Sequence, residues 1–397
     1  MANNNKHTGP NVPALRFPEF SGEWSKVLLS SACEINPKTD SLDSQFLYID
    51  LESVVKGTLA KRQIIEKDGA PSRAQRVLKE NDILYQCVRP YQLNNYFFEG
   101  DTIQCVASTG YAQLRTKHNP LYVFHALHTK QFTNQVLERC TGTNYPAINS
   151  SDLGTVEVPI CSLPEQEKIG SLLALIDSRI KTQSKIIEDL KTLRSALHHQ
   201  IMRNGLADGS WEQKRLSEVL LERTELNSKE YAVHSVSVSK GIVNQIEYLG
   251  RSFAAKDTSK YHVAYPGDIV YTKSPTGEFP YGIIKQSHIS IKAAISPLYG
   301  VYVPLSQEIG YIIHNHFLSA KNALNYLHPL IQKGAKNTIN ITNQRFLQNS
   351  IPLPSNQNAA VLYSKTIKAV SDKIALEVSV LDKLQLQKSH FLQTMFI

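Results

Sequence analysis

The sequence predicts an α+β protein in which two homologous mixed α/β domains are separated by two long antiparallel helices that form a coiled coil. Three observations predict this class. A set of short motifs occurs twice in the same order, each half ends in a long stretch with heptad spacing, and strand-like and helix-like patterns mix before each stretch. Because one segment is duplicated, we also expect an internal pseudo-twofold relation between the halves.

The internal repeat is marked by motifs that recur at a slowly changing distance. The chain's two tryptophans, Trp24 and Trp211, each stand two residues after a glycine. Further along each half, Asp82 and Asp268 each open a run of Asp-Ile-apolar-Tyr. The series ends with Val158-Pro159 in the first half and Ile351-Pro352 in the second. An ordered series of this kind indicates a duplicated module whose period is about half of the chain.

Each half ends in a long helical pattern, which we expect over residues 164–204 and 357–397. The first opens with Pro164 and is expected to stop at Gly205, since Pro at a helix start and Gly just past its end are favoured. Seam residues recur at alternating spacings of four and three, which is a heptad repeat. The alternative is two amphipathic helices that each pack on their own domain. The expected seam of the helix pair includes Ile176, Ile180, Gln183, Ile187, Leu190, Arg194, Ile374, Glu377, Leu381, Leu384 and Lys388.

Polar residues interrupt the heptad seam of each helix and predict how the helices pair. Gln183 and Arg194 interrupt the first seam, and Glu377 and Lys388 interrupt the second. Because a polar group buried alone is unfavourable, the interruptions should meet. Antiparallel helices then set Gln183 opposite Lys388 and Arg194 opposite Glu377, whereas parallel helices would bring Arg194 against Lys388, two like charges. The pattern therefore favours the antiparallel arrangement in that register.

Composition and cysteine usage limit the class of protein. The two domains, expected over residues 1–160 and 207–354, have enough apolar residues for packed cores, since 42% of the 397 residues are hydrophobic. The five cysteines contain no Cys-x-x-Cys pair, and neither a secretory signal nor a membrane-spanning apolar run is present, so we expect a cytoplasmic protein without a membrane partner. The net charge of +8 favours an acidic partner, with nucleic acid first.

The sequence lacks the familiar catalytic motifs. It has no phosphate-binding loop, no dinucleotide-binding glycine turn, no nucleophile elbow and no Asn/Asp-Pro-Pro-aromatic tetrapeptide of amino-methyltransferases. His314-Asn315-His316 superficially suggests a nuclease but lies in an amphipathic helical pattern, so we interpret it as structural. His198-His199 is interpreted as solvated, on the outer face of the first long helix. We expect no catalytic residue, cofactor or metal ion in this chain.

Basic and polar side chains gather in regions that suit DNA binding. Residues 55–90 carry an excess of Lys and Arg, and Arg, Gln and Asn read guanine and adenine edges in the major groove. Residues 333–345 combine cations and amides without an acid. For any single Lys or Arg, an ordinary solvated position is the alternative. The DNA-binding candidates are Lys61, Arg62, Arg73, Arg76, Arg89, Tyr91, Gln92, Asn94, Thr143, Asn144, Tyr145, Lys273, Ser274, Thr276, Lys333, Lys336, Asn337 and Arg345.

Six sequence motifs, three in each half, carry a resemblance to a known family. Those in the first half are LRFPEFSGEW, NDILYQCVRPYQLNNYFF and VPICSLPEQEKIGSLLALID. Those in the second half are GSWEQKRLSEVL, GDIVYTKSPTGEFPYGI and IPLPSNQNAAVL. On these motifs, and over essentially its whole length, the chain resembles the specificity subunit of type I restriction–modification enzymes. An Ile/Val-Pro strand end followed by a helix rich in Gln, Lys and Ile is specific for that family. The second helix entry departs from the pattern, because SNQNAAVL lacks the Pro-Glu-Gln of the first.

The resemblance implies a DNA-reading subunit that is not itself an enzyme. In that family each half carries a target-recognition domain, and each domain reads one part of a split double-stranded DNA sequence. The conserved helices dock two methyltransferase subunits, through which restriction–translocase subunits join. S-adenosylmethionine is then expected on the methyltransferase subunits, and ATP and Mg²⁺ on the restriction subunits. Two alternatives stay open: a coiled-coil adaptor that does not bind DNA, and a fused methyltransferase or nuclease with unrecognised motifs.

Overall fold

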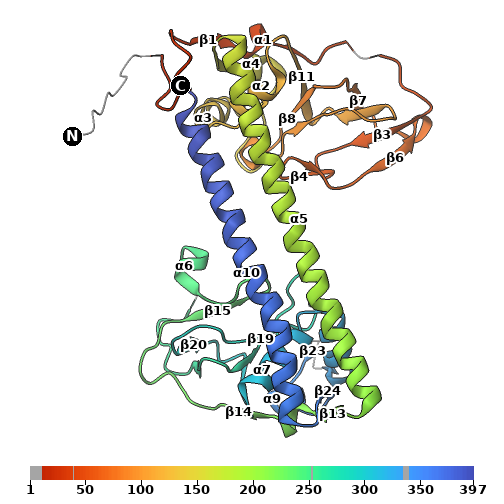
Figure 1. Ribbon diagram of the computed structural model, residues 1–397, viewed down its shortest axis with the longest axis vertical. Coiled ribbons are helices and arrows are strands. Elements are labelled where there is room, and N and C mark those ends of the chain that lie inside the picture. Colours follow the sequence, from red (N-terminus) through yellow and green to blue (C-terminus); the bar gives the residue numbers. More distant parts are fainter. Residues whose placement is uncertain (1–10, 39, 252–253, 334–338) are drawn as a thin grey trace. The chain divides into compact units, whose positions relative to one another are not determined.

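The computed structural model describes residues 11–38, 40–251, 254–333 and 339–397, and it divides into two compact units (Figure 1). Unit 1 comprises the chain up to Lys185 together with Ser379–Ile397, and unit 2 comprises Ile186–Val378. The division differs from the expected one, because each unit includes a part of each long helix. None of the described helices is both long and apolar enough to cross a membrane.

Unit 1 is built on two four-stranded sheets. One has the antiparallel order β2-β11-β8-β9, with strands Cys33–Ile35, Tyr111–Thr116, Ile83–Gln86 and Tyr96–Phe97. The other has the order β6-β3-β10-β7, with strands Gln63–Glu66, Gln45–Ile49, Cys105–Ser108 and Ala74–Val77, and its β3–β10 pair is parallel. The remaining elements are the antiparallel pair β1 (Ser25–Leu28) with β12 (Glu157–Ile160), the hairpin β4 (Val54–Val55) with β5 (Thr58–Leu59), and the short helices α1 (Leu29–Ala32), α2 (Pro120–Ala126), α3 (Lys130–Glu138), α4 (Ser150–Gly154), η1 (Lys67–Gly69) and η2 (Pro90–Gln92).

Unit 2 repeats the central sheet of unit 1 in the same order. The order β14-β21-β18-β19 is formed by Leu220–Glu222, Gly300–Pro304, Ile269–Tyr271 and Ile284–Gln286. The pair of β13 (Trp211–Arg215) with β24 (Ser350–Pro354) repeats β1 with β12. Other elements are β15 (His234–Ser237), β16 (Gly241–Asn244), β17 (His262–Ala264), β20 (Ala293–Ile295), β22 (Gln332–Lys333), β23 (Ile339–Asn340), α6 (Gln245–Leu249), α7 (Gln307–His316), α8 (Ala320–Leu327), α9 (Asn343–Phe346), η3 (Leu216–Glu218) and η4 (His328–Leu330). The matching topology confirms the internal repeat and the α+β class.

Short polar side chains start corresponding helices in the two units. An Asn, Ser or Thr side chain before each helix accepts a hydrogen bond from a first-turn N–H, which otherwise has no partner within the helix. The caps of α2, α3 and α4 are Asn119, Thr129 and Asn149, and those of α7, α8 and α9 are Ser306, Ser319 and Thr342. The His-Asn-His run lies within α7, as expected from its amphipathic pattern.

A buried aspartate supports the central sheet of each unit. Asp82, just before β8, is fully buried and accepts two hydrogen bonds from Arg115, at 2.9 and 2.8 Å. Asp268, just before β18, accepts two from Arg223, at 2.7 and 3.0 Å. Each carboxylate also accepts from a backbone N–H three residues earlier. The two arginines stand on different strands of the repeat, because Arg115 lies in β11 and Arg223 directly follows β14.

The first long helix is longer than predicted. Helix α5 spans Leu163–Asp208, so Gly205 lies inside it and the expected stop there is wrong. A Cβ at Gly205 would clash with the Trp211 ring, so this glycine allows the tryptophan to approach the helix backbone. The helix ends before Gly209, whose φ of +79° is the left-handed conformation typical of a C-terminal cap. The second long helix, α10, spans Gln357–Thr394.

The two long helices are antiparallel, as predicted. In unit 1, Ile169 and Leu173 from the start of α5 share a core with Met395 and Phe396, which directly follow α10. In unit 2, Leu197 from the end of α5 packs on the core that contains Tyr363 and Ile367 from the start of α10. The seam positions named above are all buried or half-buried along both helices.

The predicted register of the helix pair is wrong. In unit 1, Lys388 Nζ lies 2.5 Å from the carboxylate of Asp177, which precedes the expected partner Gln183 by more than a helical turn. In unit 2, burial lowers the pKa of Arg194, and the nearby Tyr311 and Tyr363 act on that pKa in the opposite direction. Glu377, its expected partner, forms an ion pair with Lys373 on its own helix. Lys388 and Glu377 thus form ion pairs with residues other than the predicted ones.

The interpretation of His198 as solvated is also wrong. Its side chain is 3% exposed, and its Nδ1 lies 2.6 Å from the Tyr363 hydroxyl. Burial lowers the pKa of His198 to about 3, so the folded protein holds a neutral imidazole there. The adjacent His199 is exposed.

The buried His198 predicts that unit 2 loses stability in mild acid. The unfolded chain protonates His198 as the pH falls through about 6.5, whereas the folded chain stays neutral, so acid favours unfolding. At pH 5 this single group should lower the free energy of unfolding by about 2 kcal/mol relative to pH 7. Urea denaturation followed by Trp211 fluorescence in a Trp24→Phe background measures it. His198→Gln should reduce the pH dependence by about this amount, while His314 and His316, whose pKa values burial also lowers, keep their own contribution. The control His199→Gln should leave the slope unchanged, and equal slopes in both variants would contradict the assignment.

The buried Asp82 predicts a large loss of stability when its charge is removed. Asp82→Asn leaves Arg115 without its anionic partner, and we expect the free energy of unfolding to fall by about 2–4 kcal/mol. Asp101→Asn is the matched control, because the Arg62 of its ion pair is exposed and such pairs contribute at most about 1 kcal/mol. Urea denaturation followed by Trp24 fluorescence in a Trp211→Phe background compares them. Equal losses in the two variants would count against the structural role of Asp82.

Candidate nucleic-acid interface

The segment that follows β8 carries four of the predicted DNA-binding residues on a tightly held loop. Arg89 and Leu93 flank η2 and both have a φ of +53°, which is left-handed backbone. The N–H of Arg89 donates to the Pro146 carbonyl at 2.8 Å, and the N–H of Gln92 donates to the Arg89 carbonyl at 3.0 Å. The Tyr91 side chain is 50% exposed. The loop therefore presents side chains to solvent from a fixed backbone.

Two buried amide side chains, Gln86 and Asn95, fix this loop through hydrogen bonds. Gln86 Nε2 donates to the Val88 carbonyl at 2.7 Å and to Gln92 Oε1 at 3.0 Å, while Gln86 Oε1 accepts from the Asn94 N–H. Asn95 Oδ1 accepts from the Gln86 N–H at 2.8 Å. Neither Gln86 nor Asn95 was a candidate from the sequence, although a Gln or Asn inside an apolar strand pattern is a detectable signal. Their hydrogen bonds fix the loop conformation.

A second loop lies against the first. Ala147 forms backbone bridges with both Thr141 and Val88, so residues 141–147 are joined to the end of β8. Gly142 has a φ of +87°, and a Cβ there would stand 3.2 Å from the Tyr145 carbonyl, so the turn requires glycine. Thr143 and Asn144 are exposed at its tip, and the Tyr145 side chain is 65% exposed. The Arg89 guanidinium lies 4.2 Å from the centre of the Tyr145 ring, a cation–π contact.

A third element lies in the basic region 55–90 but was not among the DNA-binding candidates. The turn between β4 and β5 places Lys56 in left-handed backbone, with a φ of +50°. Its N–H donates to Asn94 Oδ1 at 2.9 Å, which ties the turn to the first loop. Asn94 therefore has a structural role in the free protein. The Lys56 side chain is exposed.

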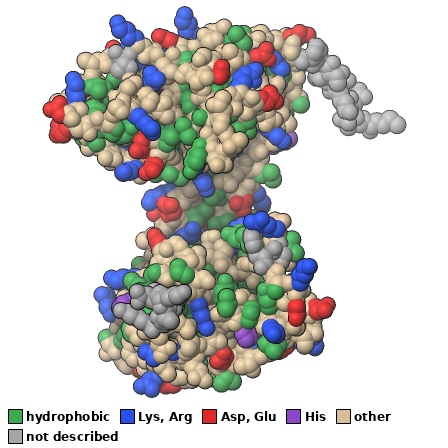
Figure 2. Space-filling view, turned by 180° about the vertical axis from the view of Figure 1, so that it is seen from behind, with side chains coloured by type: hydrophobic (Ala, Val, Ile, Leu, Met, Phe, Trp, Pro, Cys, Tyr) green, Lys and Arg blue, Asp and Glu red, His purple; other side chains and the backbone are tan. Residues whose placement is uncertain are grey.

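The remaining candidates of unit 1 have mixed environments. Lys61 and Arg73 are exposed, and Arg62 is paired with Asp101 at 2.7 Å. Arg76 lies in β7 and is half-buried, and burial lowers its pKa. On the face shown in Figure 2, Lys and Arg side chains are interspersed with Asp and Glu. The structure brings together the loop residues but not all of the predicted cations.

In unit 2, the segment after β18 corresponds to the Arg89 loop. Lys273 is half-buried, which lowers its pKa, while Ser274 and Thr276 are exposed. Arg345 Nε donates to the Leu330 carbonyl at 2.8 Å, so it joins α9 to η4. Lys333 ends β22, but its side chain lies outside the described part. Lys336 and Asn337 lie outside the described residues.

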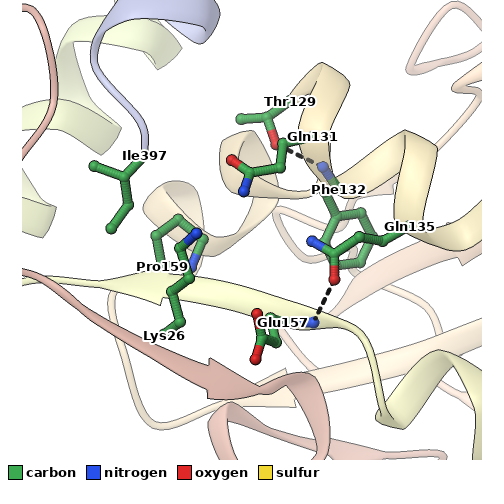
Figure 3. A pocket seen from close by; sticks show the side chains of 8 residues that line it. All are labelled: Lys26, Thr129, Gln131, Phe132, Gln135, Glu157, Pro159 and Ile397. Carbon is green, nitrogen blue, oxygen red and sulfur yellow. Dashed lines mark hydrogen bonds between the residues drawn. The ribbon is translucent and has the colours of Figure 1, made fainter. Parts of the chain in front are cut away.

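A small cavity of unit 1 is a packing feature of α3 and β12 (Figure 3). Gln135 Oε1 accepts from the Glu157 N–H at 3.2 Å, and Thr129 Oγ1 accepts from the Phe132 N–H at 3.3 Å. The Gln135 bond joins the helix to the strand, and the Thr129 bond caps the start of α3. Among the described residues, no group of three or more His, Cys, Asp or Glu is arranged to hold a metal ion. The lining residues are Lys26, Thr129, Gln131, Phe132, Gln135, Glu157, Pro159 and Ile397.

Comparison with known proteins finds a family model and a curated relative that are similar in sequence to part of this chain. Residues 22–192 match the family model described as type I restriction modification DNA specificity domain. The type I restriction enzyme HindI specificity subunit of Haemophilus influenzae is 25% identical over 164 residues, and the aligned part covers 40% of this chain and 33% of that relative. The chain thus aligns with about a third of the length of this curated relative.

Solved structures extend the likeness in fold to nearly the whole chain. The type I restriction–modification system S subunit from M. genitalium is 14% identical, with a TM-score of 0.59 and coverage of 97% of this chain and 99% of that one. A chain from a study of complex assembly and conformational transition of the type I R-M system is 19% identical, with a TM-score of 0.50 and coverage of 94% and 97%. Residues 22–192 are thus similar in sequence to type I restriction modification DNA specificity domains, and the chain as a whole is similar in fold to the S subunit from M. genitalium.

Proposed function

We propose that this chain is the DNA sequence-specificity subunit of a type I restriction–modification complex, and that it recognises a bipartite double-stranded target. The observation that carries the proposal is the duplicated frame with different loops. The two units share strand order, helix caps and a buried aspartate, whereas the segments after β8 and β18 differ in sequence. In the first unit this frame belongs to a matched DNA specificity domain.

The duplication explains why the target has two parts. The DNA backbone has local twofold symmetry whatever its sequence, so two related readers can each contact one segment of the duplex. Because their loops differ, the two segments differ in sequence. DNA between them is then not read.

In the proposed complex the chain reads DNA and organises other subunits. Two methyltransferase subunits with S-adenosylmethionine perform the chemistry of modification, and restriction–translocase subunits with ATP and Mg²⁺ join through them. The chain itself is non-catalytic and acts in the cytoplasm. Incubation of the chain alone with DNA, labelled S-adenosylmethionine and Mg²⁺ separates this function from a fused enzyme, since any turnover would favour the enzyme.

The proposal predicts DNA binding that weakens steeply with salt. Cations that neutralise phosphates release counterions, so the logarithm of the affinity falls linearly with the logarithm of salt concentration. We expect Arg89→Ala and Lys273→Ala each to weaken binding of the assembled complex to a selected duplex. Fluorescence anisotropy between about 50 and 200 mM salt measures the slope.

Arg62→Ala is the comparison for this experiment: Arg62 is a DNA-binding candidate from the sequence, but its ion pair with Asp101 should make its loss of affinity smaller than that of Arg89→Ala. An affinity that stays flat over this salt range would overturn the nucleic-acid function. No shift of pooled random duplexes in a gel would instead favour the coiled-coil adaptor.

A second prediction concerns the independence of the two readers. Replacing residues 25–157 with the matching segment of a relative should change one half of the selected target and preserve the other. The exchange is feasible because the segment begins in β1 and ends at the start of β12, and these two strands pair with each other. Sequencing of duplexes selected from a random pool reads both halves at once. A change in both halves, or in neither, would contradict one domain reading one half.

A further inference from the structure

The loops that join at the end of β8 contain several residues other than glycine in left-handed backbone. These loops are the β4–β5 turn, the segment after β8 and residues 141–147. Six described residues other than glycine have positive φ, and Lys56, Arg89 and Leu93 are three of them. Such a conformation is unfavourable for a side chain with a Cβ, and a fold keeps it where surrounding contacts impose it. Here those contacts are the hydrogen bonds of Asn94, Gln86 and the Pro146 carbonyl. The strain therefore lies at a surface that the fold holds rigid.

Arg89 differs from Arg115, Arg223 and Arg345, which are also half-buried, because its donors stay available. Arg115 is committed to Asp82, Arg223 to Asp268 and Arg345 to the Leu330 carbonyl. Within the described residues, the guanidinium of Arg89 forms no hydrogen bond or ion pair, and its one cation–π contact is with the Tyr145 ring. A guanidinium stacked on a ring keeps its N–H donors in its own plane, where they can reach an acceptor pair.

We propose that Arg89 is the side chain with which unit 1 reads a guanine in the major groove of its half-site. Its guanidinium would donate to O6 and N7 of the base, the pair of acceptors that arginine recognises in a bidentate manner. Tyr145 limits the motion of the arginine, and the backbone hydrogen bonds of Arg89 fix its starting point. Lys56, on the adjoining turn, contacts phosphate and carries no sequence information. This inference rests on the proposed function.

The assignment predicts a loss of base preference when Arg89 is changed and a uniform loss of affinity when Lys56 is changed. Selection from a random pool of duplexes distinguishes the two. The full-length chain is assembled with its methyltransferase subunits, and bound DNA is sequenced for each variant. Arg89→Ala should abolish the preference for guanine at one position of one half-site, a loss of discrimination of about 5- to 150-fold there. Lys56→Ala should weaken binding to all sequences alike and leave the preferences intact.

Three further variants separate base recognition from an effect on folding. Arg89→Gly removes the side chain but suits the φ of +53°, so it should relax the same position as Arg89→Ala while the unfolding free energy is kept or raised. Tyr145→Phe keeps the ring and should keep the preference, whereas Tyr145→Ala should weaken it. A uniform loss of affinity in Arg89→Gly, with every base preference preserved, would overturn the inference and leave the proposed function standing. A wild-type complex that enriches no sequence at all would overturn both.

Discussion

Each compact unit depends on one constraint, which is that both long helices must complete its hydrophobic core. The Trp24 ring packs edge-on against Phe396, just after α10, at a centroid distance of 6.2 Å. The Trp211 ring packs in the same manner on Tyr363, near the start of α10, at 5.5 Å. Aromatic side chains of this kind each bury about 150–250 Å². The tryptophan that opens each module therefore also fixes the helix direction, because opposite ends of α10 serve the two units.

The elements that follow from periodic patterns were predictable from the sequence. The repeat, the heptad spacing and the antiparallel direction depend on many residues at once, so a few misread positions do not change the conclusion. The polar breaks at Arg194 and Lys388 carried the charge argument that excluded a parallel pair. The same charges did not determine the register, because each long side chain had partners within reach that only the folded domains supply, such as Asp177 for Lys388.

Single residues were misread where tertiary packing overrides a local preference. Glycine often ends a helix, but Gly205 lies within α5 and leaves space for the Trp211 ring. The helix ends before Gly209, which has the positive φ of a C-terminal cap. His198 stands next to an exposed histidine in sequence, yet its ring is buried against Tyr363. The loop positions Arg89, Tyr91 and Tyr145 could be proposed from composition. Their joining through Gln86 and Lys56 could not, because those hydrogen bonds link segments that are distant in the chain.

The two units show which parts of such a domain are free to vary. The buried aspartate is retained, but its arginine comes from β11 in one unit and from the end of β14 in the other, so the charge balance matters more than the position of the donor. The reading loops vary further. In unit 2 the segment after β18 closes a turn between Thr276 and Phe279 and assigns the positive φ to Gly277, where unit 1 imposes it on an arginine. At such a position the backbone conformation fixes the direction of an arginine side chain. A glycine has no side chain, so neighbouring residues must make any contact there. A common frame that tolerates both solutions can therefore present different side chains to the two half-sites that we propose, without a change of fold.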